Sequence, residues 1–278
     1  MVPTVLVVVV LALYPLLFSI AAALNESSLG KPFNGFVGLE NFEDVLGDPD
    51  VIGALLRTVL YALAVTAVSV IVGLTIALAL DRAIRIGALL RTIFLLPLLT
   101  PAVTVAILWK VILSPSGGLL STVLTDLGLD GSALSPLSST ALALPTIALA
   151  DVWEWTPLVT ILLFAALQAV DWEMVEAGTL DGAHGWSLLV RIVIPAIAGA
   201  IAAVALIRLV LAFKVFDLVA VLTAGGPGQS TTTASYLTFQ RALQQFDVGQ
   251  ASVITLCLAV VVTVVTIPFV VAMRRAHA

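Results

Sequence analysis

The chain carries the short polar sequence Glu176-Ala177-Gly178-Thr179-Leu180-Asp181-Gly182-Ala183 between two long apolar segments. Pro195 follows twelve residues later, in the sequence Ile192-Val193-Ile194-Pro195. A polar connection of this kind stands out because nearly everything around it is hydrophobic. It marks the place where one long apolar segment ends and the next begins.

The composition excludes a water-soluble domain. Hydrophobic residues make up 61% of the 278 residues and charged residues only 10%. Soluble domains carry roughly a quarter charged residues, so this chain has too few to cover a surface that faces water. A polytopic membrane protein is therefore predicted. The net charge of −5 adds little, because the placement of charges matters more than their sum.

Six segments are long and apolar enough to cross a bilayer, for which a helix needs about 20 mostly apolar residues. They are residues 3–24, 55–80, 92–113, 140–169, 192–222 and 250–273. We therefore expect an all-α fold with six transmembrane helices. The first segment lacks the basic region and small-residue cleavage site of a signal peptide, so it is interpreted as a retained helix. Kinks are expected at Pro97, Pro101 and Pro157, where a backbone donor is missing.

The distribution of basic residues predicts the orientation in the membrane. One set of connections holds Arg82, Arg85, Arg91, Arg191, Arg274 and Arg275. The opposite set holds only Lys31 and Arg241, among many acidic residues. The positive-inside rule therefore predicts that both termini and the loop 170–191 face the cytoplasm. The opposite loops, near 25–54, 114–139 and 223–249, are short and suit a docking surface.

No pattern of an enzyme is present in the sequence. A G-x-x-x-x-G-K-[ST] phosphate-binding loop is absent, so we do not expect the chain to bind ATP itself. The two histidines, His184 and His277, belong to no cluster with metal-ligand spacing, and no Ser-His-Asp set can be assembled. We expect no catalytic residue, no metal and no cofactor in this chain, and no nucleic-acid partner.

Five motifs, in the right order, carry a family resemblance over about residues 55–275. The segment 176–183 with Pro195 resembles the EAA loop of ATP-binding-cassette (ABC) importer permeases, with the pattern E-A-G-x-x-D-G-A ending at I-x-I-P. The other four resemble motifs of sugar permeases: Arg91-Thr92-Ile93-Phe94-Leu95-Leu96-Pro97; Trp109-Lys110 with Ser116-Gly117-Gly118-Leu119-Leu120; Phe216-Asp217-Leu218 with Leu222-Thr223-Ala224-Gly225-Gly226-Pro227; and Phe246-Asp247-Val248-Gly249-Gln250-Ala251-Ser252. Together they resemble the binding-protein-dependent carbohydrate permeases, and specifically the maltose-type "F" partner of a permease pair.

This resemblance implies the type I importer permease fold, with an N-terminal helix and outer loop over 1–54 and a five-helix core over 55–278. It implies a multi-pass protein of the cytoplasmic (inner) membrane. The implied partners are a second permease subunit, ABC ATPase subunits that hold ATP and Mg, an extracytoplasmic sugar-binding protein, the sugar and the lipid. The function implied is sugar import. Nine of the twelve Lys and Arg residues are arginine, which is typical of bacteria with G+C-rich genomes. Asp151, Glu154 and Leu158 depart from the residues of the maltose-type pocket, and the two observations together make a disaccharide such as trehalose a candidate substrate.

The resemblance also implies that the loop 170–191 couples the chain to the ATPase. The residues assigned to coupling are Glu173, Glu176, Ala177, Gly178, Asp181, Gly182 and Ala183. Asp171 is predicted to cap a helix that starts near Trp172, and Gly182 to supply the left-handed turn that ends it. Ala177 and Gly178, the latter in place of the family's usual alanine, are expected to leave one side of this helix bare for another protein's groove.

Charged residues inside a span are costly and are therefore functional candidates. Asp151, Glu154 and Leu158 lie at i, i+3 and i+7 and share one face of a helix. Carboxylates accept hydrogen bonds from sugar hydroxyls, and an aromatic ring covers the apolar face of a sugar. Counting from the EAA-like loop, the resemblance places this segment and Arg208 at the sugar pocket of the maltose-type permease. The predicted substrate-binding residues are Asp151, Glu154, Trp155, Leu158, Arg208, Leu211 and Ala212.

Three alternatives stay open at this point. Arg208 could pair with Asp151 or Glu154 only to neutralise buried charge. The same three residues could serve an ion-coupled secondary transporter, although such folds usually show inverted repeats. A non-transporting membrane scaffold would leave the charges inside the spans unexplained.

Overall fold

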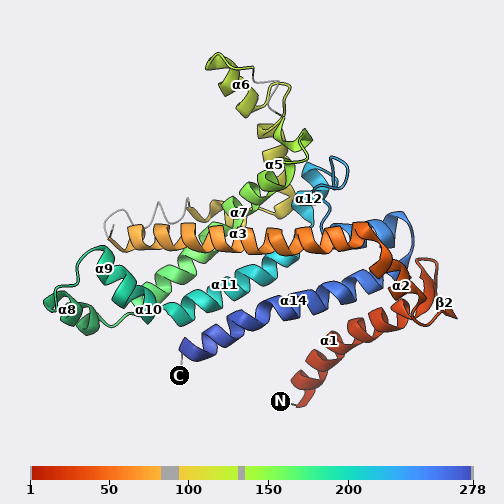
Figure 1. Cartoon of the computed structure of the whole chain (residues 1–278), viewed down its shortest axis with the longest axis horizontal. Helices are drawn as coiled ribbons and strands as arrows, with labels where there is room; N and C mark the ends of the chain where they lie inside the picture. The colour runs from red at the N-terminus through yellow and green to blue at the C-terminus, as the bar shows by residue number, and fades with distance from the viewer. Residues whose placement is uncertain (1, 83–93, 131–134, 277–278) are drawn as a thin grey trace.

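The computed structural model describes residues 2–82, 94–130 and 135–276, and this part of the chain is mostly helical (Figure 1). The α-helices are α1 (Val2–Ala23), α2 (Glu40–Gly47), α3 (Pro49–Arg82), α5 (Ala102–Ile112), α6 (Leu119–Asp126), α7 (Ala143–Gln168), α8 (Trp172–Leu180), α9 (Trp186–Leu188), α10 (Ile194–Ala196), α11 (Ala198–Phe213), α12 (Asp217–Leu222), α13 (Ala234–Phe239) and α14 (Val248–Ala276). A 3₁₀ turn, η1 (Pro136–Ser138), and two π-helical turns, η2 (Leu189–Val193) and η3 (Gln240–Gln244), complete the helical elements of these residues. The predicted all-α class is confirmed.

Long apolar helices run through the molecule. Within the described residues, three helices are long and apolar enough to cross a membrane: α3, α7 and α14. A fourth span results if the segments Trp186–Ala196 and Ala198–Phe213, bent by 69° at the break between them, are taken together. The apolar stretches Val9–Ala23 and Ala102–Ile112 are shorter.

Two of the predicted spans are not single helices. The span predicted at 92–113 is interrupted at Pro101, the residue before α5, because a proline cannot donate to the preceding turn. The span predicted at 192–222 is broken at Ile197 and again after Phe213. By contrast, α7 continues through Pro157 as one helix. The predicted cytoplasmic residues Arg85, Arg91 and His277 lie outside the described residues.

A β-hairpin lies within residues 25–54, where the sequence predicts only a short loop. Strands β1 (Asn25–Ser28) and β2 (Lys31–Phe36) pair antiparallel. The sequence Asn-Glu-Ser-Ser lacks the β-branched and aromatic residues that favour strands, so propensity does not predict it. A tertiary contact supports the hairpin, because the Leu29 amide donates to the Phe246 carbonyl at 3.3 Å, next to the start of α14.

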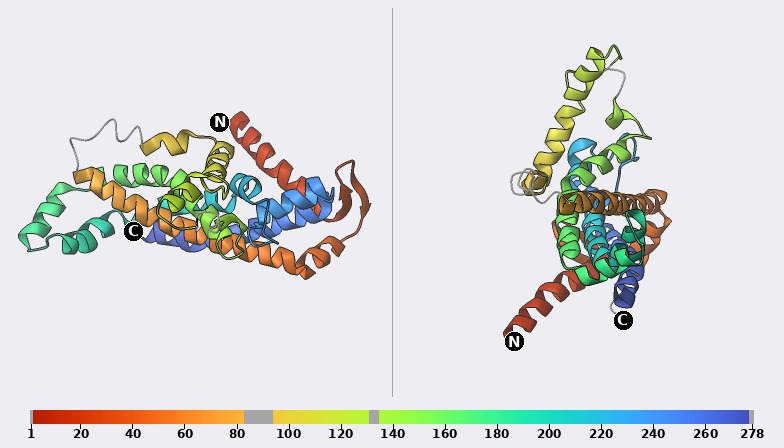
Figure 2. Two further views of the ribbon diagram at one scale, coloured as in Figure 1. Left: turned by 90° about the horizontal axis from the view of Figure 1, so that it is seen from above. Right: turned by 90° about the vertical axis from the view of Figure 1, so that its left-hand side faces the viewer.

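The bundle is built around α3, α7, α11 and α14, which run side by side in Figures 1 and 2. α3 packs on α7 along most of its length, and the two helices approach closely at Gly73. A Cβ atom at Gly73 would lie 2.7 Å from Cγ1 of Val159. The hairpin and α8 lie at opposite ends of this bundle, while α1 and the α5–α6 segment project away from it (Figures 1 and 2). We refer to these ends as the hairpin end and the α8 end.

The polarity of the bundle is that of a protein solvated by lipid. Large aliphatic side chains such as Leu60 and Ile71 of α3 and Val260 of α14 are exposed on its outside. Charged side chains of the same bundle, by contrast, are buried inside it. Such a surface is unfavourable in water and favourable in hydrocarbon.

Candidate functional site

A buried ion pair joins α7 to α11. The Nη2 of Arg208 donates to Oδ2 of Asp151, and the two side chains are 1% and 5% exposed. The Nε of Arg208 donates to Oγ of Ser69 on α3 at 3.3 Å. The structure therefore settles which acid Arg208 pairs with: it is Asp151 rather than Glu154, and a third helix also holds the guanidinium.

Glu154 lies one turn further along α7 and is itself 4% exposed. Its Oε2 is buried without a hydrogen-bond partner in the described part of the chain, and the same holds for Nη1 of Arg208. A buried charged atom without a partner is costly, and native structures contain few of them. Glu154 and Arg208 thus offer one unused acceptor and one unused donor, which is the complement of a polyhydroxyl ligand, and the hydroxyl of Tyr61 on α3 is also buried without a partner in the described residues.

Two residues of α3 belong to this cluster and were missed by the sequence analysis. Ser69 holds the guanidinium of Arg208, as described above. Tyr61 is 3% exposed and lies within electrostatic reach of Asp151, Glu154 and Arg208. A serine in an apolar helix usually bonds its own backbone, so no sequence signal distinguishes Ser69.

The remaining predicted substrate residues are less clearly grouped. Trp155, Leu158 and Leu211 are half-buried, and Ala212 is packed into the hydrophobic core beside α3. An apolar groove of about 430 Å³ runs between α3 and α7, with Tyr61 and Val152 on its wall next to the charged cluster. Asp151, Glu154 and Arg208 are thus the part of the prediction that the structure brings together.

The loop between α7 and α11 contains the predicted short helix, α8, and its ends are capped as expected. Asp171 accepts a hydrogen bond from the amide of Glu173 at 2.9 Å, which satisfies a free donor of the first turn. At the other end Gly182 has a φ of +89°. Its amide donates to Thr179 at 3.1 Å and that of Ala183 donates to Gly178 at 2.9 Å. These two bonds form a Schellman motif.

The exposed face of α8 is acidic with apolar edges. The coupling candidates Glu173, Glu176, Ala177, Asp181 and Gly182 are exposed, and Ala183 is half-buried. Leu180 is 89% exposed and Trp186, at the start of α9, is 76% exposed. Exposed apolar side chains next to charged ones are typical of a surface that another protein covers.

Gly178 does not leave a bare side for a partner, so this part of the prediction is wrong. It is buried, because α8 folds back against the following segment. A Cβ atom at Gly178 would collide with Cδ1 of Ile192 in η2. The glycine that replaces the family's usual alanine therefore serves internal packing: it lets η2 approach α8 closely.

We expect Gly178→Ala to weaken this packing modestly. The obstructing atom is the end of a flexible side chain, so Ile192 must change rotamer, at a cost of about 1 kcal/mol. Ile192→Val removes Cδ1 and should restore the stability of the Gly178→Ala protein, although it lowers stability on its own. Thermal unfolding of the four proteins in detergent measures this compensation. Additive losses in the double variant would contradict it.

The loop is continuous with the helix that carries the buried pair. From α9 the chain passes through η2 and α10, bends by 69° at Ile197, and enters α11, where Arg208 lies. A π-helical turn such as η2 often marks a functional site. A movement of α8 can therefore reach Arg208 along the backbone, through η2, α10 and α11.

The comparisons with known proteins agree with this geometry. Residues 69–277 match the family described as "Binding-protein-dependent transport system inner membrane component". The trehalose/maltose transport system permease protein MalF of Thermococcus litoralis is 32% identical over 265 residues, covering 95% of this chain and 89% of MalF. The trehalose transport system permease protein SugA of Mycobacterium tuberculosis is 31% identical over 273 residues, covering 96% of this chain and 85% of SugA.

A solved structure shares the fold. It is a chain of a bacterial alginate ABC transporter, crystallised in complex with an alginate pentasaccharide-bound periplasmic protein. The similarity has a TM-score of 0.81 at 23% identity and covers 99% of this chain and 92% of that chain. It confirms the predicted fold.

Proposed function

Because this chain belongs to the family of binding-protein-dependent transport system inner membrane components, we propose a specific role for it in sugar import. It is the multi-pass permease subunit of an ABC importer in the inner membrane. Its substrate is a disaccharide such as trehalose. The names of two relatives, the trehalose/maltose permease MalF and the trehalose permease SugA, include trehalose, and their similarity covers nearly the whole of this chain.

The chain works as one part of a larger assembly. A second permease subunit completes the path across the membrane, and separate ATPase subunits bind ATP and Mg. An extracytoplasmic sugar-binding protein delivers the sugar at the hairpin end. Both termini and α8 face the cytoplasm, because the positive-inside rule favours the cytoplasm for the arginine-rich connections on the side of α8. The exposed acidic face of α8, with Leu180 and Trp186 beside it, then lies where an ATPase subunit can bind it.

One observation supports a neutral sugar as the substrate. Oε2 of Glu154 and Nη1 of Arg208 are buried inside a membrane bundle without partners among the described residues. A sugar hydroxyl both donates and accepts, so a single sugar can satisfy a carboxylate and a guanidinium together. An acidic polysaccharide such as alginate fits less well, because its carboxylates would be repelled by Glu154.

The direction of transport follows from differences in affinity between two states. The loaded binding protein favours the state open to the outside, and ATP favours closure of the ATPase subunits. That closure moves α8, and the movement reaches Arg208 through η2, α10 and α11. A ligand that binds both states equally does not change the equilibrium between them. The importer therefore needs both the binding protein and ATP to prefer one state over the other. The chain itself performs no chemistry in this scheme.

Purification of the tagged chain from its native membrane tests the proposal. We expect an ATPase with a phosphate-binding loop and a second polytopic permease to purify with it. Uptake of labelled trehalose should then persist with a protonophore and stop when ATP is depleted. A chain that purifies alone, with uptake abolished by the protonophore, would identify an ion-coupled secondary transporter instead.

A further inference from the structure

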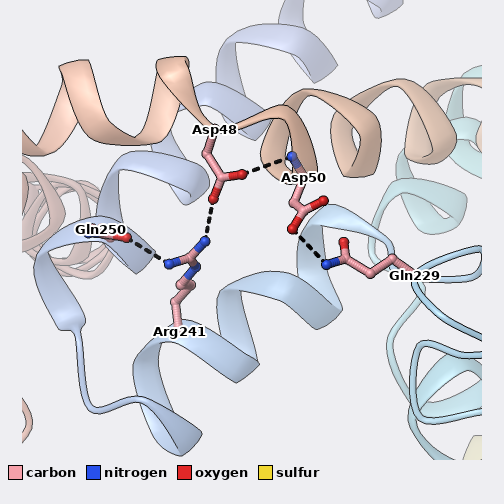
Figure 3. Close-up of polar contacts among 5 residues, drawn as sticks. All are labelled: Asp48, Asp50, Gln229, Arg241 and Gln250. Carbon is pink, nitrogen blue, oxygen red and sulfur yellow. Dashed lines mark hydrogen bonds and ion pairs between the residues drawn. The ribbon is translucent and has the colours of Figure 1, made fainter.

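Five polar residues form one network at the hairpin end (Figure 3). Asp48 accepts a hydrogen bond from the amide of Asp50 at 2.9 Å and so caps α3. It also pairs with Arg241 of η3, whose Nη1 donates to Oε1 of Gln250 on α14 at 3.1 Å. Gln229 donates its Nε2 to Oδ2 of Asp50 at 2.7 Å. We call these five residues the clamp.

The clamp joins parts of the chain that lie far apart in sequence. It connects the start of α3 with the π-helical turn η3, the first turn of α14, and the loop that contains Gln229. An isolated exposed ion pair contributes little to stability. Here Asp48 and Arg241 are 24% and 22% exposed, and each makes a second hydrogen bond. The second bonds fix the geometry of both side chains.

A second row of contacts lies further along α3. The Nε of Arg57 donates to the carbonyl of Thr232 at 3.0 Å, and Oγ1 of Thr58 accepts from the amide of Ala234 at 2.8 Å. Thr232 also donates its hydroxyl to the carbonyl of Gly225 at 3.1 Å. The loop 225–234 is therefore bound along α3 from its first turn to its third.

The other half of α3 reaches the buried ion pair. α3 continues without a break from Pro49 to Arg82, and the distance from Asp50 to Ser69 along a straight helix is about 28 Å. Ser69 accepts the hydrogen bond from Arg208 described above. A rigid helix thus connects the loop 225–234 to the guanidinium of Arg208.

We propose that the clamp is a positioning device that makes α3 and the loop 225–234 move as one body. A partner that seats on this loop then displaces Ser69 relative to Arg208 and alters the buried pair with Asp151. This inference rests on the proposed function, in which that partner is the sugar-binding protein. The residues of the clamp touch neither the sugar nor the ATPase; they act through α3.

The experiment uses the complete transporter in lipid vesicles, and it measures ATP hydrolysis without and with the loaded binding protein. We expect Gln229→Ala and Arg241→Gln to lower the stimulated rate by about fivefold, the low end of a typical coupling between sites. The basal rate should stay unchanged. Gln244→Ala is the matched control, because Gln244 is an exposed residue of the same π-helical turn outside the clamp. Arg241→Lys keeps a cation for Asp48 and should recover part of the stimulation.

A double variant tests whether the two members of one bond act together. Asp50→Ala combined with Gln229→Ala should lower the stimulated rate no more than either change alone, since both remove the same hydrogen bond.

Three outcomes would contradict the proposal. Wild-type stimulation in Gln229→Ala and Arg241→Gln would overturn the role of the clamp and leave the proposed importer function intact. Equal losses of basal and stimulated rates would also overturn it, because they indicate a structural role only. A wild-type transporter that no sugar-binding protein stimulates would instead remove the proposed function, and the clamp with it.

Discussion

Replacing Glu154 by alanine is expected to reduce sugar uptake by about two orders of magnitude, while the complex assembles in normal amounts. The carboxylate lies inside the bundle with its Oε2 unpartnered in the described residues. A site built to bind a hydroxyl loses a large factor when the hydrogen bond is lost. Assembly should not suffer, because Oε2 of Glu154 makes no hydrogen bond in the described part of the chain and Arg208 keeps Asp151 as its partner. Uptake of labelled sugar into vesicles, set against the amount of purified complex, measures the effect.

Two further variants make this result interpretable. Glu154→Gln retains an acceptor oxygen without the charge and should lose about tenfold, less than alanine does. Glu43→Ala removes an exposed glutamate of α2 at the hairpin end and should transport like the wild type. Normal uptake by Glu154→Ala would exclude the carboxylate from the sugar site.

The second large effect concerns the partner of the buried pair. Arg208→Ala leaves Asp151 as an uncompensated charge on α7, which costs about 3–5 kcal/mol. We expect the complex to be lost or to unfold at a markedly lower temperature. Arg274→Gln, which removes an exposed arginine near the end of α14, serves as the control and should have little effect. Thermal unfolding of the purified complexes gives the comparison.

A double variant separates stability from transport. Asp151→Asn combined with Arg208→Gln replaces the ion pair by neutral groups of similar shape and should restore most of the stability. It should still fail to transport, because Nη1 of Arg208 is then absent. Full transport by this double variant would show that Arg208 only neutralises Asp151, the alternative that the sequence left open.

The caps of α8 were predictable because their structure is local. Asp171 bonds to an amide two residues away, and the turn at Gly182 closes through bonds within the same few residues. Such caps depend on residue type and spacing alone. The buried position of Gly178 was not predictable, because it depends on Ile192, which reaches α8 only after the chain has turned back.

The buried site was predictable in its members but not in its connections. Charged residues in apolar segments are rare and are functional candidates, so Asp151, Glu154 and Arg208 could be predicted as members of the site. Asp151 and Glu154 are three residues apart on one face of α7, and nothing in the sequence ranks them as partners for Arg208. The rotation of α11 against α7 makes that choice, and the position of α3 adds Ser69.

By itself, the sequence determined the membrane class, the succession of apolar segments, the capped helix α8 and the charged residues that the bundle has to bury. These follow from composition and from interactions within a few residues of the chain. Only the tertiary structure decided the break at Ile197, the β-hairpin, the pairing of Arg208 with Asp151, and the clamp. Bonds such as that between Asp48 and Arg241 join residues 193 positions apart. They form because packing of the helices brings residues from distant parts of the chain together, which no local pattern records.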